Sequence, residues 1–508
     1  MKKKKIFNKN KRYLSPSVVL FIITFIIVII STVFSLLEID ASITEVNNNT
    51  LETSLVTMNN ILTTKGFKNF FSNVIENFAN YKALFYLIIS LMGIGMLDKS
   101  GLLCNLLKPF KGIKNSISTF LILLLSILLA SLGDAGYCIA IPLSAIIYKY
   151  LNRNPMVGII TSFLGVSICY GTSFIYNNNN LLIGKLMESA ARVEVDKNFS
   201  FELYSNLFIN IGAVLLFSIL GTLIIEKFLA PKFTRKNKCE IEEVKTNKKA
   251  SFFTFITFIL SLFLIVYGLI PGYPLSGLLL DNDASGYIEQ VWSNGSPFKE
   301  GITFIISLIF IVISSVYAIL SKKINNSQEF SESLTFGLKG IEKILVLMFI
   351  VSQLIGIIEW THIDQVIAGN LIEFLSVLQF SGFPLIILFF FIVFVIGIII
   401  PSTITKWNIT APLIIPLFMR SNIAPEFTTF VFSAADGISK CFTPINSGFI
   451  IMLGFLNKYN QEDTSVTLFG TYNKIRSTIL LLLLVWLLII TGWFLIGLPL
   501  GSGVYPTL

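Results

Sequence analysis

Long apolar runs alternate with short polar segments along the whole chain. Two of the runs, Val18–Leu36 and Ser477–Ile496, are close to the ~20 residues that a helix needs to cross the hydrocarbon core of a membrane. Polar residues interrupt two of the apolar stretches, so we predict that two of the helices are discontinuous. The pattern predicts an all-α polytopic protein with nine transmembrane helices, near residues 15–37, 83–98, 156–195 (interrupted), 203–226, 251–270, 301–320, 341–360, 426–457 (interrupted) and 477–497.

Two further pairs of apolar segments, 117–132 with 135–151 and 383–399 with 407–419, are joined too closely for two ordinary crossings each. We predict that each pair is a re-entrant hairpin, which enters the membrane and returns on the same side. With a cytoplasmic N-terminus, this topology places 28 of the 38 Lys and Arg residues in cytoplasmic segments, which agrees with the positive-inside rule. The C-terminus then lies outside, in a multi-pass protein of the cell (inner) membrane that contacts lipid.

Composition excludes several other classes of protein. Of the 508 residues, 54% are hydrophobic and only 13% are charged, whereas soluble domains carry about 25% charged residues. The basic residues that give the net charge of +9 are concentrated in the predicted cytoplasmic segments. The positive-inside rule explains this charge, so we expect no nucleic-acid partner. The five cysteines show no metal-type spacing and His362 is the single histidine, so we expect no metal site and no cofactor. Because the chain has no Walker A loop and no convincing catalytic constellation, we expect that it is not an enzyme.

The chain divides into two halves around a charged linker. We predict an N-terminal half at residues 1–230, a cytoplasmic linker at 231–250 and a C-terminal half at 251–508. Each half contains one unit made of a hairpin followed by a broken helix, at 117–195 and 383–457. None of the loops is long enough for a convincing soluble catalytic domain.

An internal repeat relates these two units. When the chain is shifted by 270 positions, "IAIPLSAIIYKYLNRNP" (Ile139–Pro155) lies on "ITAPLIIPLFMRSNIAP" (Ile409–Pro425). In the topology above, the first unit starts from inside and the second from outside, so the repeat is inverted. Inverted repeats with unwound helices are typical of secondary transporters, whose substrate site lies near the midplane. The identical pairs are Ile139/Ile409, Pro142/Pro412, Leu143/Leu413, Asn152/Asn422, Pro155/Pro425, Ile168/Ile438 and Ile175/Ile445.

The hairpin tips and the helix breaks carry the candidate chemistry. Backbone groups released from a helix must face protein or a water-filled cavity, since lipid cannot satisfy them. Helix N-termini at a tip attract anions, and unwound carbonyls can hold a cation. The candidate residues are Asp134 at the first tip, Ser402, Thr403 and Thr405 at the second tip, Ser173 and Asn180 in the first break, and Thr443 and Pro444 in the second break.

Several motifs together resemble the AbgT family of transporters over nearly the whole chain. The resemblance implies nine transmembrane helices and two re-entrant hairpins in a homodimer. It also implies uptake of the small molecule p-aminobenzoyl-glutamate, a folate breakdown product, and export of sulfonamide-type antimetabolites, coupled to an ion gradient (H⁺ or Na⁺). The motifs are "LMGIGMLDKSGLL", "GDAGYCIAIPLSAIIYKYLNRNP", "ESAARVEVD", "TKWNITAPLIIPLF", "SAADGISKCFTPI" and "GLPLGSG".

The family's functional positions carry over only in part. Its tryptophan after the second tip matches Trp407, with Lys406 before it, its aspartate in the second broken helix matches Asp436, and its Thr-Pro break matches Thr443–Pro444. We expect substrate contacts at Lys406 and Trp407. An acid within a membrane segment is costly and is usually functional, so we expect ion coupling, or else a substrate contact, at Asp436. The departures are Ser433 in place of an arginine, Gly397 in place of an asparagine and Asn180 in place of an acid.

Lys440 is a further candidate residue, and several of the candidates have alternative interpretations. Lys440 lies four residues after Asp436, which permits either a substrate contact or a structural ion pair between the two. Trp407 could instead belong to an interfacial belt, and Lys406 could extend to the external surface. For the whole protein, the alternatives are a dicarboxylate-type sodium symporter with the same two-hairpin plan and a channel built from fixed half-helices.

Overall fold

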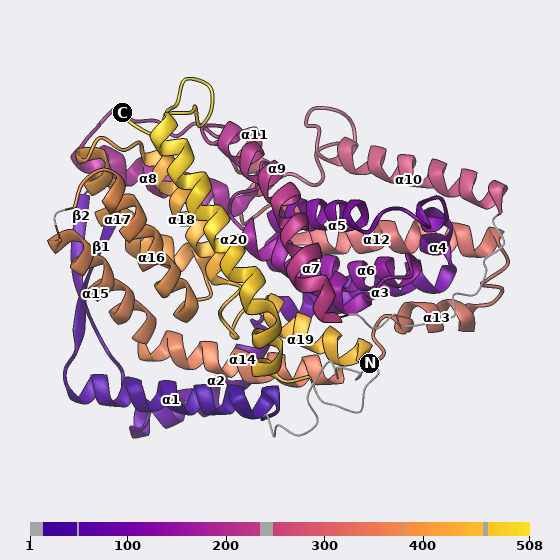
Figure 1. The fold of residues 1–508 in the computed structure, drawn as a ribbon, viewed down its shortest axis with the longest axis horizontal. Helices are drawn as coiled ribbons and strands as arrows, with labels where there is room; N and C mark the ends of the chain where they lie inside the picture. Colours follow the sequence, from indigo (N-terminus) through magenta and orange to yellow (C-terminus); the bar gives the residue numbers. More distant parts are fainter. Residues whose placement is uncertain (1–13, 48–49, 234–246, 379, 461–465) are drawn as a thin grey trace.

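The computed structural model describes residues 14–47, 50–233, 247–378, 380–460 and 466–508, and these residues are mostly helical (Figure 1). Most of the predicted linker at 231–250 lies outside the described residues. The N-terminal half contains α1 (Pro16–Leu36), β1 (Asp40–Asn47), β2 (Thr50–Thr57), α2 (Thr64–Ala79), α3 (Lys82–Ser100), α4 (Leu102–Leu107), η1 (Lys108–Phe110), α5 (Asn115–Leu129), η2 (Ala130–Leu132), α6 (Asp134–Tyr150), α7 (Pro155–Ile168), α8 (Asn178–Glu194), α9 (Leu207–Ile224), the π-helical η3 (Ile225–Leu229) and η4 (Ala230–Phe233). The C-terminal half contains α10 (Lys248–Gly268), α11 (Tyr287–Trp292), α12 (Pro297–Leu320), α13 (Ser327–Phe336), α14 (Glu342–Thr361), α15 (Ile363–Val377), α16 (Phe383–Ile399), α17 (Thr403–Arg420), α18 (Pro425–Ser439), α19 (Ser447–Tyr459) and α20 (Leu468–Ile496).

Eight helices of the described residues are long and apolar enough to cross a membrane. Seven of them coincide with the uninterrupted helices that the sequence predicts, and the eighth is the first arm of the first hairpin, α5 with η2. The two interrupted helices are split as expected, into α7 and α8 and into α18 and α19. Each half has fewer than 18 residues, so neither broken helix enters the count of eight.

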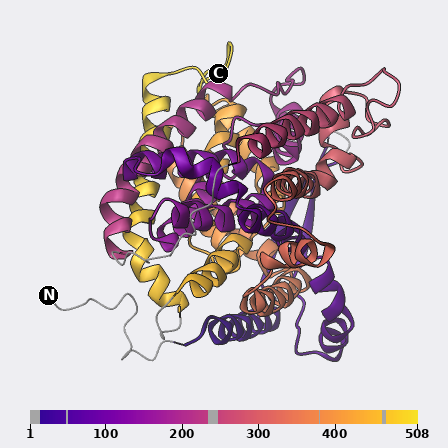
Figure 2. The same ribbon diagram turned by 90° about the vertical axis from the view of Figure 1, so that its right-hand side faces the viewer.

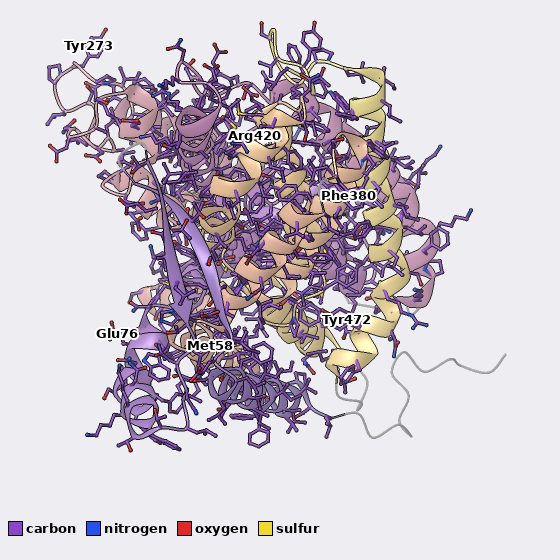
Figure 3. All side chains as sticks on the ribbon, turned by 90° about the vertical axis from the view of Figure 1, so that its left-hand side faces the viewer. Met58, Glu76, Tyr273, Phe380, Arg420 and Tyr472 are labelled. Carbon is purple, nitrogen blue, oxygen red and sulfur yellow. The ribbon has the colours of Figure 1, made fainter. Side chains whose placement is uncertain are left out.

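One small sheet was not predicted. Strands β1 and β2 pair antiparallel, with Asp40 opposite Thr57 at the open end, and α15 packs on β1. Figure 3 shows the two strands lying along one side of the helical body, and Tyr273 on a projecting loop at the upper left of the view. This segment is rich in Thr and Ser, and the alternation of apolar and polar residues in "DASITEVN" is typical of a strand.

Helices at the centre and at the edge of the molecule differ in burial. Every residue of α7 and of α18 is buried, whereas α10 buries only Ala250, Thr254 and Gly268. Helix α10 and the loop that follows it project from the body (Figure 2). The exposed surface of α10 is rich in Phe, Leu and Ile, as expected for a helix in contact with lipid. The first halves of the two broken helices, α7 and α18, therefore lie in the protein interior, where polar side chains can find partners.

The two hairpin units have matching backbone geometry. Asn152 and Asn422, 270 positions apart, both adopt the left-handed conformation with φ of 57° and 60°. Each asparagine follows the second hairpin arm, and each is followed three residues later by a proline that begins α7 or α18. Asparagine tolerates this conformation better than most residues, so it ends the arm in a tight turn. The equivalence found in the sequence thus extends to the turn geometry.

The two units also pack against each other in a reciprocal way. Helices α5 and α6 pack on α7, and α16 and α17 pack on α18. The second half of each broken helix then packs on the hairpin of the other unit, α8 on α17 and α19 on α6. This exchange brings both hairpin tips and both breaks to the centre of the molecule.

Candidate functional site

A cavity of about 380 Å³ lies where the two tips and the two breaks meet. Asp134 lines the cavity from the first tip and Tyr170 from the first break. Pro401–Ile404 line it from the second tip, and Ile445 and Asn446 line it from the end of the second break, followed by Ser447 at the start of α19. Lys440, at the end of α18, also lines it. The remaining wall comes from the start of α3, from Asn179 at the start of α8 and from the C-terminal part of α14. The structure therefore brings together four segments that lie far apart in the sequence.

A buried ionic cluster lies beside this cavity. Lys406 forms an ion pair with Asp436 Oδ1, and Lys440 Nζ lies 3.4 Å from Asp436 Oδ2. The hydroxyl of Thr403 donates a hydrogen bond of 2.6 Å to the same Oδ2. All three charged side chains are at most 2% exposed. Because two ammonium groups share one carboxylate, the cluster has an excess positive charge, which is costly in a buried site without an anion.

Lys440 connects this cluster to the cavity wall. Its ammonium nitrogen donates to the carbonyl oxygen of Pro401 (3.1 Å) and lies over the ring of Tyr170. A cation above an aromatic face is attracted by the ring's negative face. The excess positive charge therefore reaches the cavity through Lys440.

Asp134 lies on another part of the same wall and has polar partners from both units. Its Oδ1 accepts hydrogen bonds from the hydroxyl of Tyr170 (3.1 Å) and from the hydroxyl of Ser447 (3.0 Å). It begins α6 directly after Gly133, whose φ of 59° is a conformation that glycine adopts readily. A Cβ at Gly133 would also lie 3.2 Å from the Tyr170 hydroxyl, so a side chain there would crowd this hydrogen bond.

A second cavity of about 230 Å³ adjoins the first. Asp134, Tyr170, Lys82 and Asn179 line both cavities. The second cavity adds Trp292 and Lys299 from the predicted external side. On this side, Lys185 of α8 pairs with Glu289 of α11 at 2.5 Å, and this hydrogen-bonded ion pair holds the pKa of Glu289 below its usual value. The pair joins the external loop to the broken helix.

Three helices, α17, α19 and α8, begin at the walls of these two cavities. Ser402 caps α17 by accepting from Thr405 N (3.3 Å), and it also accepts from the Thr405 hydroxyl (2.9 Å). Asn446 caps α19 by accepting from Gly448 N (2.7 Å), and Asn177 caps α8 by accepting from Asn180 N (3.0 Å). Positive dipole ends near a cavity favour a negatively charged ligand.

Trp407 lies inside the protein and does not line the cavity. It is fully buried, its indole N–H donates to the carbonyl of Ile183 (3.0 Å), and its ring packs on Phe432 at 4.5 Å between centroids. It therefore joins the second hairpin to α8. The interfacial-belt alternative does not agree with this burial.

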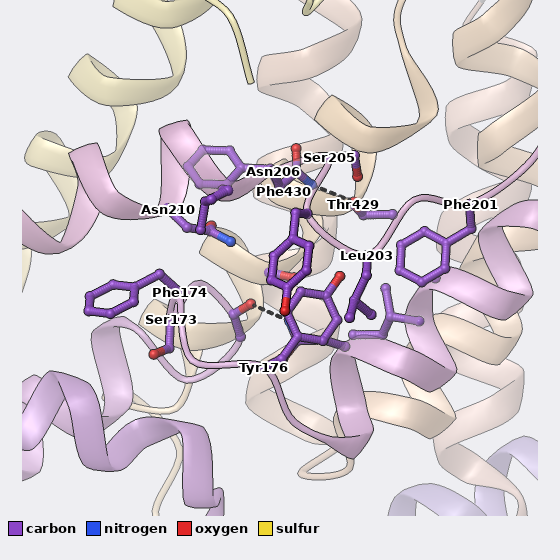
Figure 4. Close-up of a pocket in the computed structure, with 17 residues that line it drawn as sticks. Ser173, Phe174, Tyr176, Phe201, Leu203, Ser205, Asn206, Asn210, Thr429 and Phe430 are labelled. Carbon is purple, nitrogen blue, oxygen red and sulfur yellow. Dashed lines mark hydrogen bonds between the residues drawn. The ribbon is translucent and has the colours of Figure 1, made fainter. Parts of the chain in front are cut away.

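Two of the predicted residues lie elsewhere. Ser173 and Asn180 line a separate, smaller pocket of about 40 Å³ together with Ser433 (Figure 4). In that pocket, Asn206 donates to the hydroxyl of Thr429 (3.2 Å).

The second break itself forms a buried turn. The Thr443 hydroxyl accepts from Ile445 N at 3.4 Å, and the half-buried Pro444 lies between these two residues. Neither Thr443 nor Pro444 lines the main cavity.

The sequence reading did not identify several lining residues. Lys82 at the start of α3, Glu359 near the end of α14 and Ser447 at the start of α19 were not among the candidates, although all three line the main cavity. Charged residues at the ends of apolar helices are common, so Lys82 and Glu359 gave no specific signal. Ser447 directly follows the second break, and a search for hydroxyls at the first turn of α19 could have found it.

Within the described residues, no group of three His, Cys, Asp or Glu side chains is placed to hold a metal ion. The described cysteines, Cys104, Cys138, Cys169 and Cys441, are buried free thiols, and Cys239 lies outside the described residues. His362 forms the left-handed turn between α14 and α15. None of these residues therefore adds a ligand to the cavity.

The chain is similar to transporters in every comparison with known proteins. Residues 8–508 match the family described as "AbgT putative transporter family". The chain is 26% identical over 457 residues to the p-aminobenzoyl-glutamate transport protein of Escherichia coli (strain K12), an alignment that covers 89% of this chain and 88% of that protein.

Two solved structures are similar in fold. The YdaH transporter of Alcanivorax borkumensis has a TM-score of 0.51 and 23% identity, over 96% of this chain and 100% of the other. MtrF of Neisseria gonorrhoeae, from a class of antimetabolite efflux pumps, has a TM-score of 0.50 and 22% identity, over 97% and 98% of the two chains.

Proposed function

This chain belongs to the AbgT transporter family, and from that membership we propose that it is a secondary transporter, driven by an ion gradient, of p-aminobenzoyl-glutamate or a related aromatic, anionic solute. The similarity to the Escherichia coli p-aminobenzoyl-glutamate transport protein supports this substrate class. Membership in a transporter family also supports a role without a catalytic site. The protein then acts in the cell (inner) membrane, with its N-terminus in the cytoplasm and its C-terminus outside.

The observation that carries the proposal is the 380 Å³ cavity between the two tips and the two breaks. Its volume is within the range of about 300–1,000 Å³ that is usual for small-molecule sites. Lys440 and the N-termini of α17 and α19 supply positive potential for a carboxylate. Tyr170 supplies an aromatic ring whose face is in contact with Lys440, and Ser402, Thr403 and Ser447 supply hydroxyls. These groups suit a ligand with an aromatic ring and carboxylate groups.

We place the substrate between the tips and breaks, with alternating access produced by movement of the hairpin units against the rest of the protein. Lys406 and Trp407 then support the site without contacting the substrate. Lys406 is a second ion-pair partner of Asp436, and Trp407 fixes the second hairpin against α8. Ser173 and Asn180 belong to the separate 40 Å³ pocket. Thr443 and Pro444 hold the shape of the second break.

The direction of transport follows the gradients, because a reversible carrier can run either way. MtrF belongs to a class of antimetabolite efflux pumps, which supports export of sulfonamide-type drugs as a second activity of the same site. The proposed assembly is a homodimer.

The decisive experiment is uptake of labelled p-aminobenzoyl-glutamate into proteoliposomes under imposed proton or sodium gradients. We expect saturable uptake, accumulation above the external concentration, and exchange of internal for external solute. Flux that does not saturate and never exceeds equilibration would indicate a channel. Uptake of simple dicarboxylates in place of the aromatic solute would instead identify a dicarboxylate-type sodium symporter.

A further inference from the structure

The charged groups around Asp436 disfavour binding of a transported cation there. One oxygen is paired with Lys406, and the other accepts from Thr403 and lies 3.4 Å from Lys440. A sodium ion at this carboxylate would lie close to two ammonium groups, which repel it. Protonation would remove the only negative charge of the cluster and leave two buried ammonium groups without a counter-ion, which is strongly unfavourable. Asp436 is therefore suited to remain a permanent counter-ion.

Asp134 has the opposite properties. Among the described residues it forms no ion pair, and its two hydrogen-bond donors, Tyr170 and Ser447, are neutral hydroxyls that both bind Oδ1. Its side chain is half-buried and lines both the 380 Å³ and the 230 Å³ cavities. A cation can reach this carboxylate, and the hydroxyl oxygens beside it can serve as further ligands for a hard ion.

We propose that Asp134, with the hydroxyls of Tyr170 and Ser447, forms the site that binds the coupling cation, a proton or a sodium ion. This assignment rests on the proposed function and replaces Asp436 in the coupling role. The three groups come from the first hairpin, the first break and the first turn of α19 in the second unit. A cation bound there acts on the contact between the two units, which is the contact that must change when access alternates.

The cavity wall carries two opposite charges, which a bound substrate and a bound cation can neutralise together. Lys440 brings excess positive charge to one part of the wall, and Asp134 brings negative charge to another. A bound substrate carboxylate compensates Lys440, and a bound cation compensates Asp134, so joint binding leaves the cavity close to neutral. When the loaded cavity is close to neutral, the change of access moves no net charge through the low-dielectric interior. The titratable and charged groups that face or surround Asp134 are Tyr81, Lys82, Tyr86, Tyr137, Cys138, Tyr170, Lys299, Glu359 and Lys440.

The test compares accumulation with exchange in proteoliposomes, using labelled p-aminobenzoyl-glutamate and, in separate arms, a proton gradient and a sodium gradient. The arm that drives accumulation by the wild type identifies the cation. We expect Asp134→Asn to lose accumulation and to equilibrate only, and we expect any solute exchange that it retains at equal concentrations to be independent of the cation that drives the wild type, because that cation has lost its binding carboxylate. Asp283→Asn, which removes an exposed carboxylate from the external loop, is the matched control and should accumulate normally.

Tyr170→Phe and Ser447→Ala provide a second, milder test if Asp134→Asn does not fold. Each removes one hydroxyl partner and keeps the carboxylate. We expect the cation concentration for half-maximal accumulation to change by roughly tenfold, the size expected for a hydrogen bond to a charged group. It should rise for sodium, which loses a ligand, and fall for protons, because each hydroxyl stabilises the ionised carboxylate.

The outcomes separate this inference from the proposed function. Without saturable transport by the wild type, the proposed function itself is wrong. If the wild type accumulates solute and Asp134→Asn does so equally, or if exchange by Asp134→Asn depends on the driving cation as in the wild type, the coupling assignment to Asp134 is overturned. If Asp134→Asn neither accumulates nor exchanges, the two hydroxyl variants decide. An unchanged cation dependence in both hydroxyl variants would also overturn it.

Discussion

The ammonium nitrogen of Lys440 lies 4.2 Å from the centroid of the Tyr170 ring. Tyr170 lies in the first break and Lys440 lies at the end of α18, directly before the second break, so this contact joins the two units at the cavity. Tyr170 in turn stacks on Tyr137 with 6.1 Å between the ring centroids, and its hydroxyl reaches Asp134. One aromatic ring therefore contacts a cation on its face and an anion at its hydroxyl.

The first prediction concerns the buried ionic cluster. Asp436→Asn leaves Lys406 and Lys440 without a counter-ion, and we expect a loss of about 3–5 kcal/mol of stability. Lys406→Met keeps the apolar stem and leaves one carboxylate with one ammonium group, so its loss should be smaller. Thermal unfolding of the purified variants in detergent measures both. An Asp436→Asn variant that is as stable as Lys406→Met would contradict the shared-carboxylate interpretation.

The second prediction concerns Trp407. Because its side chain is fully buried and hydrogen-bonded to Ile183, Trp407→Ala should cost about 3–5 kcal/mol of stability, mainly through the cavity it creates. Trp407→Phe should cost less, since it retains most of the packing and loses mainly one hydrogen bond of about 1 kcal/mol. Melting temperatures and substrate affinity of the folded fraction should be measured together. Weaker binding at an unchanged melting temperature would show that Trp407 contacts substrate directly.

The third prediction compares two helical glycines. A Cβ at Gly397 in α16 would lie 2.1 Å from Ser439 Oγ, whereas a Cβ at Gly492 in α20 would meet no atom within 4 Å. Gly397→Ala should therefore destabilise the protein by about 1–3 kcal/mol through overpacking. Gly492→Ala should raise stability by about 0.5–1 kcal/mol, since alanine favours the helix. The melting temperatures of the two variants should shift in opposite directions, and a shift of both in the same direction would argue against this packing.

The fourth prediction concerns topology. In a background without the native cysteines, a cysteine in place of Lys149 should react with an impermeant reagent only from the cytoplasm. A cysteine in place of Asn282, an exposed residue of the loop after α10, should react only from outside. Labelling of intact cells and of inverted vesicles distinguishes the two sides. Labelling from outside at position 149 would show that the first hairpin crosses the membrane, and the two units would then not be inverted relative to each other.

The fifth prediction concerns assembly. We expect a homodimer, and therefore a protein mass of twice 56.7 kDa for particles reconstituted in nanodiscs. Native mass measurement at several protein concentrations tests this expectation. A single copy of the chain at every concentration would rule out a stable dimer.

The sequence by itself determined where most helices lie and where two of them break. Hydrophobic run length predicts α1, α3, α9, α10, α12, α14 and α20, because a helix in lipid needs an apolar surface over its whole length. The 270-residue offset predicts the equivalence of Asn152 and Asn422, since the same residue ends the same kind of turn in both units. Asp436 and Lys440 are four positions apart on one helix, so their proximity also follows from the sequence.

Only the tertiary structure decided which side chains meet. Lys406 pairs with an acid 30 positions away, Asp134 reaches a serine 313 positions away, and Trp407 faces the protein interior. Apolar composition cannot distinguish a helix that faces lipid, such as α10, from one that faces protein, because both environments accept the same side chains. The β1–β2 hairpin was likewise missed, since its stability depends on packing against α15 as well as on local alternation. Long-range pairing depends on how the two units exchange their half-helices, and that packing brings the residues of the cavity together.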